Sequence, residues 1–156
     1  MINLIWAMDE NNLIGCGDKI PWHCKEDLLY YKSKTKGKTV LMGDATYFSL
    51  KGYYKTKPLP YGKIFVATID KSLTLPDATM VYDIDDFLSN YNDELWVVGG
   101  ATIYKLSLNY ADRLYISYIQ GNHEGDKYFP SIDFSKYNLI WEEKTQAVRY
   151  TCFERK

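Results

Sequence analysis

The sequence predicts a single α/β domain with a mostly parallel central sheet, helices on both faces of the sheet and a C-terminal antiparallel hairpin at its edge. Two patterns support this prediction. Short apolar runs alternate with segments of helical character, and such alternation is typical of parallel sheets. The last two β-rich runs are separated by only a short polar step, which favours a hairpin. A length of 156 residues fits one domain, expected over 1–156.

Eight segments are predicted to be strands. The first, INLIWAM at 2–8, is almost continuously apolar, as expected for a strand that is buried on both faces of a sheet. Further β-rich runs follow at 38–43, 63–69, 78–82, 94–98 and 113–119. The runs at 137–144 and 147–155 would form the terminal hairpin.

Helical patterns lie between the predicted strands, at 25–34, 45–50, 84–91 and 101–110. The stretch 51–63 contains Gly, Pro and Lys without apolar periodicity, so we expect a surface loop there. The stretch 9–24 has few helix formers, and a loop of this length is often a functional lid.

Charge and hydropathy favour a small ligand over a polymer or a membrane. The net charge is −1, and 46% of residues are hydrophobic, so disorder is not expected. The lysines that alternate along 32–38 are diluted by Ser and Thr, which is typical of a solvated surface rather than a nucleic-acid patch. No apolar run reaches the ~18 residues of a membrane span, and the N-terminus does not resemble a signal peptide.

The cysteine pattern favours a reducing compartment. Cys16, Cys24 and Cys152 are an odd number without framework spacing, so we expect free thiols in a cytoplasmic protein. Together with His23 and His123 they offer too few ligands at suitable spacing for zinc, and no metal site is expected.

Two segments share one pattern, in which a buried strand runs into glycine and then into a helix. They are TVLMG-DAT at 39–46 and LWVVGG-AT at 95–102. In a parallel sheet both junctions would lie at the carboxyl edge, where ligands bind, and each helix N-terminus would offer free N–H groups to a phosphate. Glycine also ends strands for purely steric reasons, so each junction alone is weak evidence. A GxGxxG fingerprint is absent.

Asp27 is the acidic residue of greatest interest. It lies among Leu28, Leu29 and two tyrosines in the first turn of the predicted 25–34 helix. Desolvation on an apolar face would raise its pKa, and the carboxylate could pair with an amidine-like edge of a ligand. An acid at a helix start can simply complement the helix dipole, although Glu26 could do this alone. Trp22, just before this helix, is either a core anchor or part of the same site.

These segments occur in an order that resembles one family. The matching features are INLIWAM at 2–8, LIG at 13–15, IPW at 20–22 with Asp27 five residues later, TVLMG at 39–43, PLP at 58–60, VVGGATIY at 97–104, EGD at 124–126 and YFP at 128–130. No single motif is diagnostic, but the ordered set is highly specific. Over essentially the whole chain, the sequence resembles the dihydrofolate reductase family.

The resemblance implies an oxidoreductase that transfers a hydride from NADPH to C6 of 7,8-dihydrofolate, with protonation at N5, and so supplies tetrahydrofolate for one-carbon metabolism. The implied ligands are dihydrofolate and antifolates. The implied catalytic group consists of Asp27 on the pterin ring, Trp22 holding a water beside it, Ile20 on the lid and Tyr104 against the nicotinamide. The residues implied to bind the substrate are Ile5, Trp6, Ala7, Asp27, Leu28, Tyr31, Leu50, Lys57, Leu59, Val98 and Ser117.

The resemblance also implies a cofactor site and a fastening for the lid. Asp126 would hold the lid closed, and the Gly99–Gly100 peptide is expected to be cis. The residues implied to bind the cofactor are Ala7, Ile14, Gly15, Gly43, Asp44, Ala45, Thr46, Thr68, Gly99, Gly100, Ala101, Thr102, Ile103 and Tyr104.

Three positions depart from the family pattern. The Arg that usually follows PLP by two residues, and forks onto the folate α-carboxylate, is missing from Tyr61-Gly62-Lys63, so Lys57 or Lys63 would have to substitute. Asp44 stands where a basic residue usually holds the 2′-phosphate of the cofactor, which makes use of NADH possible beside NADPH. Thr102 stands where Arg is frequent near the diphosphate.

Two alternatives remain open at the level of sequence. A pyrimidine reductase of the riboflavin pathway shares the fold, but its substrate does not require the pair of Trp22 and Asp27. A catalytically weak folate-binding homologue is supported only by the departures just described. For a member of the dihydrofolate reductase family we expect a monomer.

Overall fold

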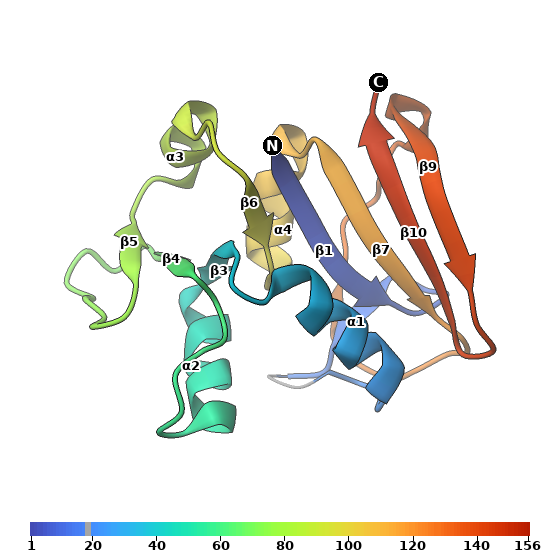
Figure 1. Ribbon diagram of the computed structural model, residues 1–156, viewed down its shortest axis with the longest axis horizontal. Helices are drawn as coiled ribbons and strands as arrows, with labels where there is room; N and C mark the ends of the chain where they lie inside the picture. Colours follow the sequence, from blue (N-terminus) through green and yellow to red (C-terminus); the bar gives the residue numbers. More distant parts are fainter. Residues whose placement is uncertain (18–19) are drawn as a thin grey trace.

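The computed structural model describes residues 1–17 and 20–156 and contains a twisted eight-stranded sheet (Figure 1). The strand order is β5-β4-β3-β6-β1-β7-β10-β9. The strands are β1 (Ile2–Met8), β3 (Thr39–Gly43), β4 (Lys63–Ala67), β5 (Thr79–Val81), β6 (Leu95–Val97), β7 (Arg113–Ile119), β9 (Tyr137–Lys144) and β10 (Val148–Arg155). Each overlaps a predicted strand.

Strand pairing agrees with the predicted fold class. β1 pairs in parallel with β6 and β7, and β3 pairs in parallel with β4 and β6. β10 runs antiparallel to both β7 and β9, which places the predicted hairpin at the edge of the sheet. The mostly parallel sheet with an antiparallel C-terminal edge is therefore confirmed.

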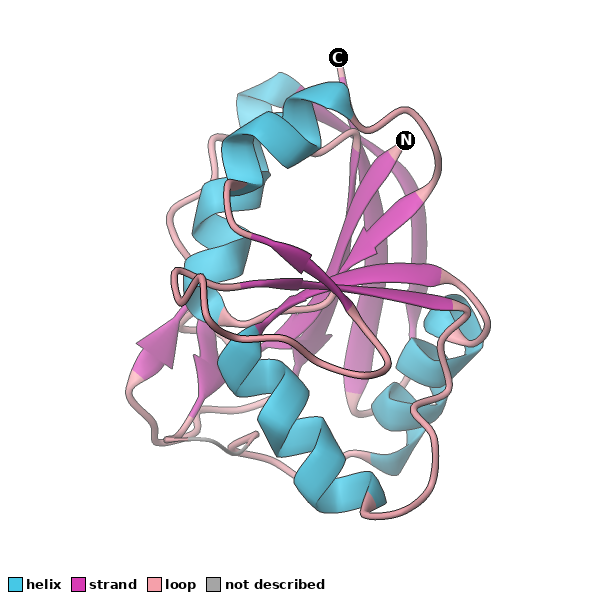
Figure 2. Cartoon of the chain, turned by 90° about the vertical axis from the view of Figure 1, so that its left-hand side faces the viewer, coloured by secondary structure: helices cyan, strands magenta, loops and turns pink. Residues whose placement is uncertain are grey.

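Helices cover both faces of the sheet (Figure 2). α1 (Lys25–Thr35) and α2 (Asp44–Tyr54) pack on one face, while α3 (Ile84–Asn90) and α4 (Ala101–Ser107) pack on the other. Alternation along β1 explains the division, because Leu4 and Trp6 point toward α4 whereas Ile5 points toward α2. In the described part of the chain, no helix is both long and apolar enough to cross a membrane.

Two local predictions were incomplete. The helix expected at 45–50 continues to Tyr54, so the first residues of the predicted 51–63 loop are helical. Tyr54 packs against the core beneath α2 and is the last residue of the helix, because the next residue, Lys55, has a positive φ of 56°. Within the 9–24 stretch, β2 (Leu13–Gly15) forms a small antiparallel sheet with β8 (Lys127–Tyr128), a pairing that spans more than a hundred residues and leaves no local signal.

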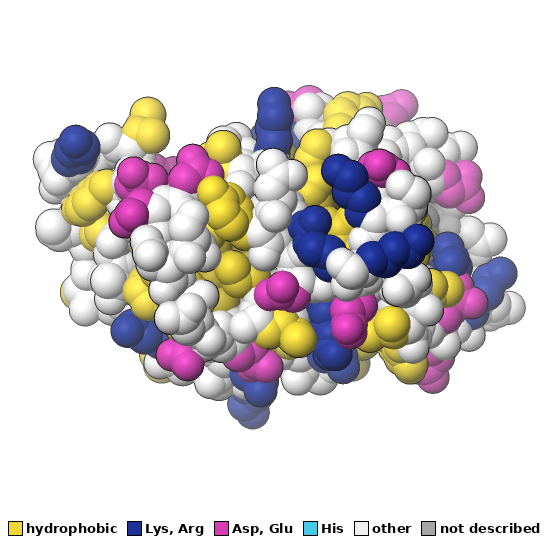
Figure 3. Space-filling model, turned by 90° about the horizontal axis from the view of Figure 1, so that it is seen from above, with side chains coloured by type: hydrophobic (Ala, Val, Ile, Leu, Met, Phe, Trp, Pro, Cys, Tyr) yellow, Lys and Arg dark blue, Asp and Glu magenta, His cyan; other side chains and the backbone are white. Residues whose placement is uncertain are grey.

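The end of the molecule that carries both termini is covered by charged side chains of both signs (Figure 3). Arg113 and Arg155 lie at this end, where β7 begins and β10 ends. Arg113 pairs with Glu154, and Arg155 donates to the carbonyl oxygens of Ala111 and Leu108. These arginines therefore fasten the chain ends, and the carboxyl ends of the parallel strands lie at the opposite end of the sheet.

Gly62 lies against the segment that follows α1. Its N–H donates to the carbonyl oxygen of Lys38 over 2.9 Å, and Gly37 N–H donates to that of Pro60 over 2.9 Å. A Cβ atom built on Gly62 would overlap the backbone carbonyl oxygen of Gly37. The backbone at this point therefore accepts only glycine without a shift.

We expect Gly62→Ala to destabilise the protein by ~1–3 kcal/mol, the usual range for overpacking. Gly52→Ala is the matched control, because Gly52 lies within α2 and a Cβ atom there would meet nothing within 4 Å. That change should instead stabilise the protein by ~0.5–1 kcal/mol through helix propensity. Urea unfolding measures both, and equal effects of the two substitutions would contradict the steric argument.

Candidate active site

The two glycine junctions lie side by side at the carboxyl edge of the sheet. Gly43 at the end of β3 donates its N–H to the carbonyl oxygen of Gly99, which follows β6, over 2.8 Å. α2 begins directly after Gly43, and α4 begins directly after Gly100. The Gly99–Gly100 peptide is cis, as the resemblance implied.

The junctions form a cradle that leaves backbone amides available. A Cβ atom on Gly43 would lie 3.0 Å from Cγ1 of Ile103, and one on Gly100 would lie 3.5 Å from Oγ1 of Thr46. Neither α2 nor α4 has a side chain that caps its N-terminus. The Ala45 N–H is bound by the Asp44 carboxylate, but the remaining N–H groups at these two neighbouring helix starts suit a diphosphate, so the cradle fits a dinucleotide. The implied cofactor residues Ala45, Thr46, Ala101 and Thr102 all lie in these first turns.

Asp44 is held in a fixed position at the start of α2. Its Oδ2 accepts a hydrogen bond from the Thr68 hydroxyl over 2.8 Å, and its Oδ1 accepts one from the Ala45 N–H over 2.7 Å. Thr68 follows β4 and is buried, and its oxygen also accepts the Asp70 N–H. The carboxylate and the hydroxyl are thus an organised pair, whereas Lys71 is exposed on the following loop.

Asp27 lies in the first turn of α1 and faces β7. Burial raises the pKa of its carboxyl group, a hydrogen bond with the Ser117 hydroxyl opposes the rise, and the negative charge of Glu26 adds to it. Ser117 itself is buried. The structure thereby brings together Asp27 and Ser117, two of the residues that the resemblance implied for the substrate.

The apolar residues implied for the substrate mostly share one cluster, between the sheet and the helices α1 and α2. The members are Ile5, Tyr31, Leu50, Leu59 and Val98. Leu28 is 43% exposed on the adjacent surface of α1. Trp6 does not join them, because its side chain points to the other face of the sheet and stacks on Phe129, with ring centres 3.8 Å apart.

A second polar feature lies at the rim of this cluster. The hydroxyl groups of Tyr31 and Tyr61 are 2.8 Å apart and hydrogen-bonded, which links α1 to the loop before β4. The pair borders a cavity of about 220 Å³, whose lining residues are Tyr31, Lys32, Thr35, Lys36, Tyr54, Pro60 and Tyr61. Lys57 and Lys63 are not in this lining, and Lys63 lies over the Phe65 ring, 4.8 Å from its centre.

Tyr104 lies between β1 and the glycine junction that follows β6. Its buried hydroxyl donates to the carbonyl oxygen of Ile5 over 2.7 Å, and burial raises the pKa of this hydroxyl. A Cβ atom on Gly99 would lie 3.4 Å from the hydroxyl oxygen of Tyr104. The ring is therefore fixed between β1 and the cis peptide.

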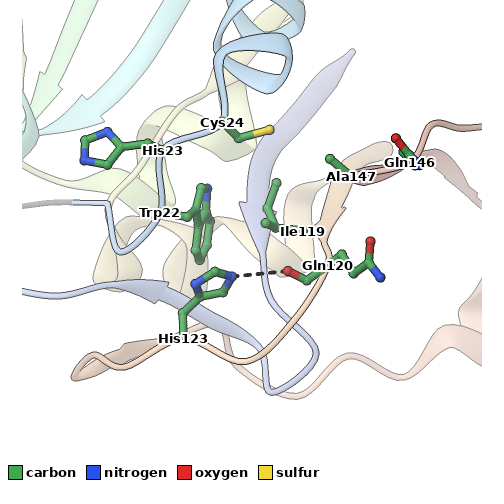
Figure 4. Close-up of a pocket in the computed structure, with 8 residues that line it drawn as sticks. All are labelled: Trp22, His23, Cys24, Ile119, Gln120, His123, Gln146 and Ala147. Carbon is green, nitrogen blue, oxygen red and sulfur yellow. Dashed lines mark hydrogen bonds between the residues drawn. The ribbon is translucent and has the colours of Figure 1, made fainter.

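Trp22 borders a larger cavity of about 690 Å³ on the side of the hairpin (Figure 4). Its ring lies 5.3 Å from that of His123, whose Nε2 is 3.3 Å from the carbonyl oxygen of Gln120. The lining residues are Trp22, His23, Cys24, Ile119, Gln120, His123, Gln146 and Ala147. Trp22 also packs against the buried cluster of Ile119, Val148 and Tyr150, so both interpretations of this residue, core anchor and site residue, have a structural counterpart.

The stretch expected to form a lid is attached to the loop before β8. Asp126 accepts the Gly17 N–H at Oδ1 over 2.8 Å, and its own N–H donates to the carbonyl oxygen of Gly15 over 3.1 Å. Ile14 and Gly15 belong to β2, and Ile20 is 63% exposed. Residues 18–19, the middle of the expected lid, lie outside the described residues.

Asp9 is a buried residue that the sequence analysis did not identify. Its carboxylate accepts the N–H groups of Asn11, Leu13 and His123. Burial alone would raise the pKa of Asp9, but these three hydrogen bonds bring it below its usual value. A polar residue directly after a buried strand was the available signal. Lys32, Lys36 and Tyr61 were also not identified, because their relation depends on the approach of α1 to a distant loop.

Comparison with known proteins gives one consistent answer. Residues 1–154 match the family described as Dihydrofolate reductase. The chain is 38% identical over 146 residues to a dihydrofolate reductase of Bacillus subtilis (strain 168), covering 92% of this chain and 84% of the relative. It is 33% identical over 150 residues to one of Mycoplasma pneumoniae, covering 91% and 90%. A solved dihydrofolate reductase from Enterococcus faecalis, complexed with NADP(H) and RAB-propyl, superposes with a TM-score of 0.85 at 27% identity, covering 100% of this chain and 96% of that one.

Proposed function

The chain belongs to the dihydrofolate reductase family, and we propose that Asp27 is the carboxylate on which its reaction depends. The enzyme is an NADPH-dependent oxidoreductase that reduces 7,8-dihydrofolate to tetrahydrofolate. The observation that supports the role of Asp27 is its place in the first turn of α1, where burial raises the pKa of its carboxyl group and Ser117 hydrogen-bonds it.

The reaction requires a hydride at C6 of the pterin and a proton at N5. NADPH supplies the hydride when bound, and the chain supplies position and electrostatics. We assign the diphosphate to the amides after Gly43 and Gly100, and the nicotinamide to the region of Ala7, Ile14 and Tyr104. The fixed ring of Tyr104, bonded to the Ile5 carbonyl oxygen, supports this assignment.

In this proposal Asp27 binds the N3 and 2-amino edge of the pterin and favours protonation at N5. The apolar cluster around Ile5 and Tyr31 excludes water from the ring. Trp22 holds a water beside Asp27, and Ile20 covers the nicotinamide when Asp126 fastens the lid. The hydrogen bond between Gly17 and Asp126 supports the last of these roles.

Replacement of Asp27 by Asn should remove most hydride transfer at neutral pH, because an amide cannot support the proton on N5. Activity should recover in part at low pH, where the substrate arrives already protonated. The measurement is kcat against pH for both proteins, with the circular dichroism spectrum checking the fold. Asp85→Asn is the matched control, since Asp85 also lies in the first turn of a helix but on α3. Wild-type rates for Asp27→Asn at pH 7 would contradict the assignment.

The glutamate tail of the substrate requires a different partner from the usual arginine. Gly62 stands at that position, and the Gly37 backbone leaves no room there for a side chain. We propose that Lys32 and Lys36 bind the tail carboxylates, because both line the cavity beside Tyr61. We propose these two lysines in place of Lys57 and Lys63, because Lys57 and Lys63 do not line that cavity.

Combined replacement of Lys32 and Lys36 by Ala should raise KM for dihydrofolate about three- to tenfold and change kcat little. An exposed ion pair contributes ~0–1 kcal/mol, and the increase should shrink at high salt because salt screens the attraction. Steady-state kinetics at two ionic strengths measures the effect. The matched control is the double variant Lys57→Ala with Lys63→Ala. A larger increase in KM for this variant would mean that Lys57 and Lys63, and not Lys32 and Lys36, bind the tail carboxylates.

Asp44 should weaken the preference for NADPH over NADH. A carboxylate about 6 Å from a phosphate opposes it by ~0.7–3 kcal/mol per unit charge, whereas a carboxylate can accept a hydrogen bond from a free ribose hydroxyl. The fixed pair of Asp44 and Thr68 supports this role.

The corresponding test is the ratio of kcat/KM for the two cofactors. Asp44→Arg should move this ratio toward NADPH by about tenfold or more, equivalent to ~1.4 kcal/mol. Asp85→Arg makes the same change of charge on α3, and it should leave the ratio of kcat/KM for the two cofactors unchanged. If Lys71 reaches the phosphate, Lys71→Ala should lower kcat/KM for NADPH and leave kcat/KM for NADH unchanged. An unchanged ratio in Asp44→Arg would mean that Asp44 does not border the ribose.

We also propose that the enzyme acts in the cytoplasm as a monomer on dihydrofolate, without nucleic acid or membrane. Three free cysteines support a reducing compartment. Sedimentation at micromolar concentration tests the monomer.

A further inference from the structure

Glu26, the neighbour of Asp27, is attached to the C-terminal hairpin. Its Oε1 accepts a hydrogen bond from the Thr145 hydroxyl over 2.5 Å and one from the Tyr150 hydroxyl over 3.1 Å. Thr145 lies in the turn between β9 and β10, and Tyr150 lies on β10. These contacts join residues that are 119 and 124 positions apart in the sequence.

Glu26 and Asp27 are hydrogen-bonded to two neighbouring strands of the sheet. Asp27 is hydrogen-bonded to Ser117 on β7, and Glu26 to Tyr150 on β10. Ser117 and Tyr150 are themselves direct partners in the pairing of these two strands. Two consecutive residues of α1 are therefore bound to two paired residues of the sheet, which fixes both the distance and the rotation of the first helical turn.

We propose that Glu26 is a positioning residue for the reaction, which holds Asp27 against β7 and adds a negative charge beside the site of protonation. The inference rests on the proposed role of Asp27. It concerns a residue outside the residues assigned above to substrate and cofactor, and it predicts an effect on pH dependence that a purely structural contact would not have.

Asp27 interacts with Glu26 and Tyr30 of α1 and with Tyr150 of β10. Further titratable groups lie around these tyrosines, among them Glu143 of β9, which is the strand partner of Tyr150 and acts on Tyr30, and Cys24 before α1, which acts on Tyr150. The charge of Glu26 acts on Asp27 directly, whereas that of Glu143 acts on Tyr30. Burial is the main cause that raises the pKa of both tyrosine hydroxyls, so both stay neutral in the working range. Glu26 is exposed, and solvent screening makes its effect small but sensitive to salt.

The sign of the effect follows from electrostatics. A negative charge near the site favours every proton bound there, whether it resides on Asp27 or on N5 of the substrate. Removing the charge should therefore make the proton leave at lower pH. Because hydride transfer needs the proton on N5, the falling limb of the rate profile should move toward lower pH.

Two substitutions separate charge from anchoring. Glu26→Gln removes the charge and keeps an oxygen that can accept from Thr145 and Tyr150, whereas Glu26→Ala removes both. Single-turnover hydride transfer with NADPH should show, for Glu26→Gln, an unchanged rate at acidic pH and a rate about threefold lower on the alkaline limb. This difference should disappear at high salt. Glu26→Ala should in addition lose rate at every pH, and Tyr150→Phe should share part of that loss.

Glu94→Gln is the matched control, because Glu94 is exposed just before β6 and pairs with Lys38. Its profile should superpose on that of the wild type. If the profile of Glu26→Gln also superposes while Asp27→Asn is inactive at neutral pH, the inference about Glu26 is wrong and the role of Asp27 stands. If Asp27→Asn keeps wild-type rates, the proposed role of Asp27 is wrong, and the role given to Glu26 fails with it.

Discussion

Burial of β1 on both faces is the constraint on which the rest of the structure depends. Its side chains enter the core on the α4 side at Leu4 and Trp6 and the core on the α2 side at Ile5. Polar chemistry is costly in such an interior, so the site lies where the parallel strands end. The carboxyl ends of β1, β3, β6 and β7 converge there, and each contributes backbone or a small polar side chain.

Sequence reasoning recovers those features whose cause is local. Apolar runs that alternate with helical segments indicate the parallel sheet, and the two glycine junctions are visible because each follows its own strand. The end of α2 was less predictable, because Gly52 and the following Lys-rich stretch look like a loop until Tyr54 finds its place in the core. The pairing of β2 with β8, and the bonds of Asp9 to the loop at His123, join distant segments and leave no periodic signal.

The arginine that is missing at Gly62 is connected in space with two other features of this chain. Gly62 stands where an arginine is usual, and the backbone after α1 approaches it so closely that no side chain fits. The same approach brings Tyr61 to Tyr31, whose hydroxyl groups bond at the mouth of a cavity lined by Lys32 and Lys36. The missing arginine, the pair of tyrosine hydroxyl groups and the two lysines therefore lie in one region of the molecule. An arginine guanidinium binds a carboxylate through two directional hydrogen bonds. In the proposed site, two lysine ammonium groups would attract the tail carboxylates of the substrate without fixing them in one geometry.

The first turn of α1 resolves a conflict between stability and chemistry. A carboxyl group whose pKa is raised by burial is most favourable when protonated, so Asp27 reduces stability as the pH rises through its folded-state pKa. The fold therefore has to hold this residue against the sheet by other contacts. Ser117 bonds Asp27 directly, and Tyr150 and Thr145 bond its neighbour from the hairpin. The antiparallel edge, added to an otherwise parallel sheet, brings Thr145 and Tyr150 to the helix, whereas Ser117 comes from β7. In the role proposed for Glu26, the contribution of the hairpin to function is positional, because its hydrogen bonds hold the residue next to Asp27.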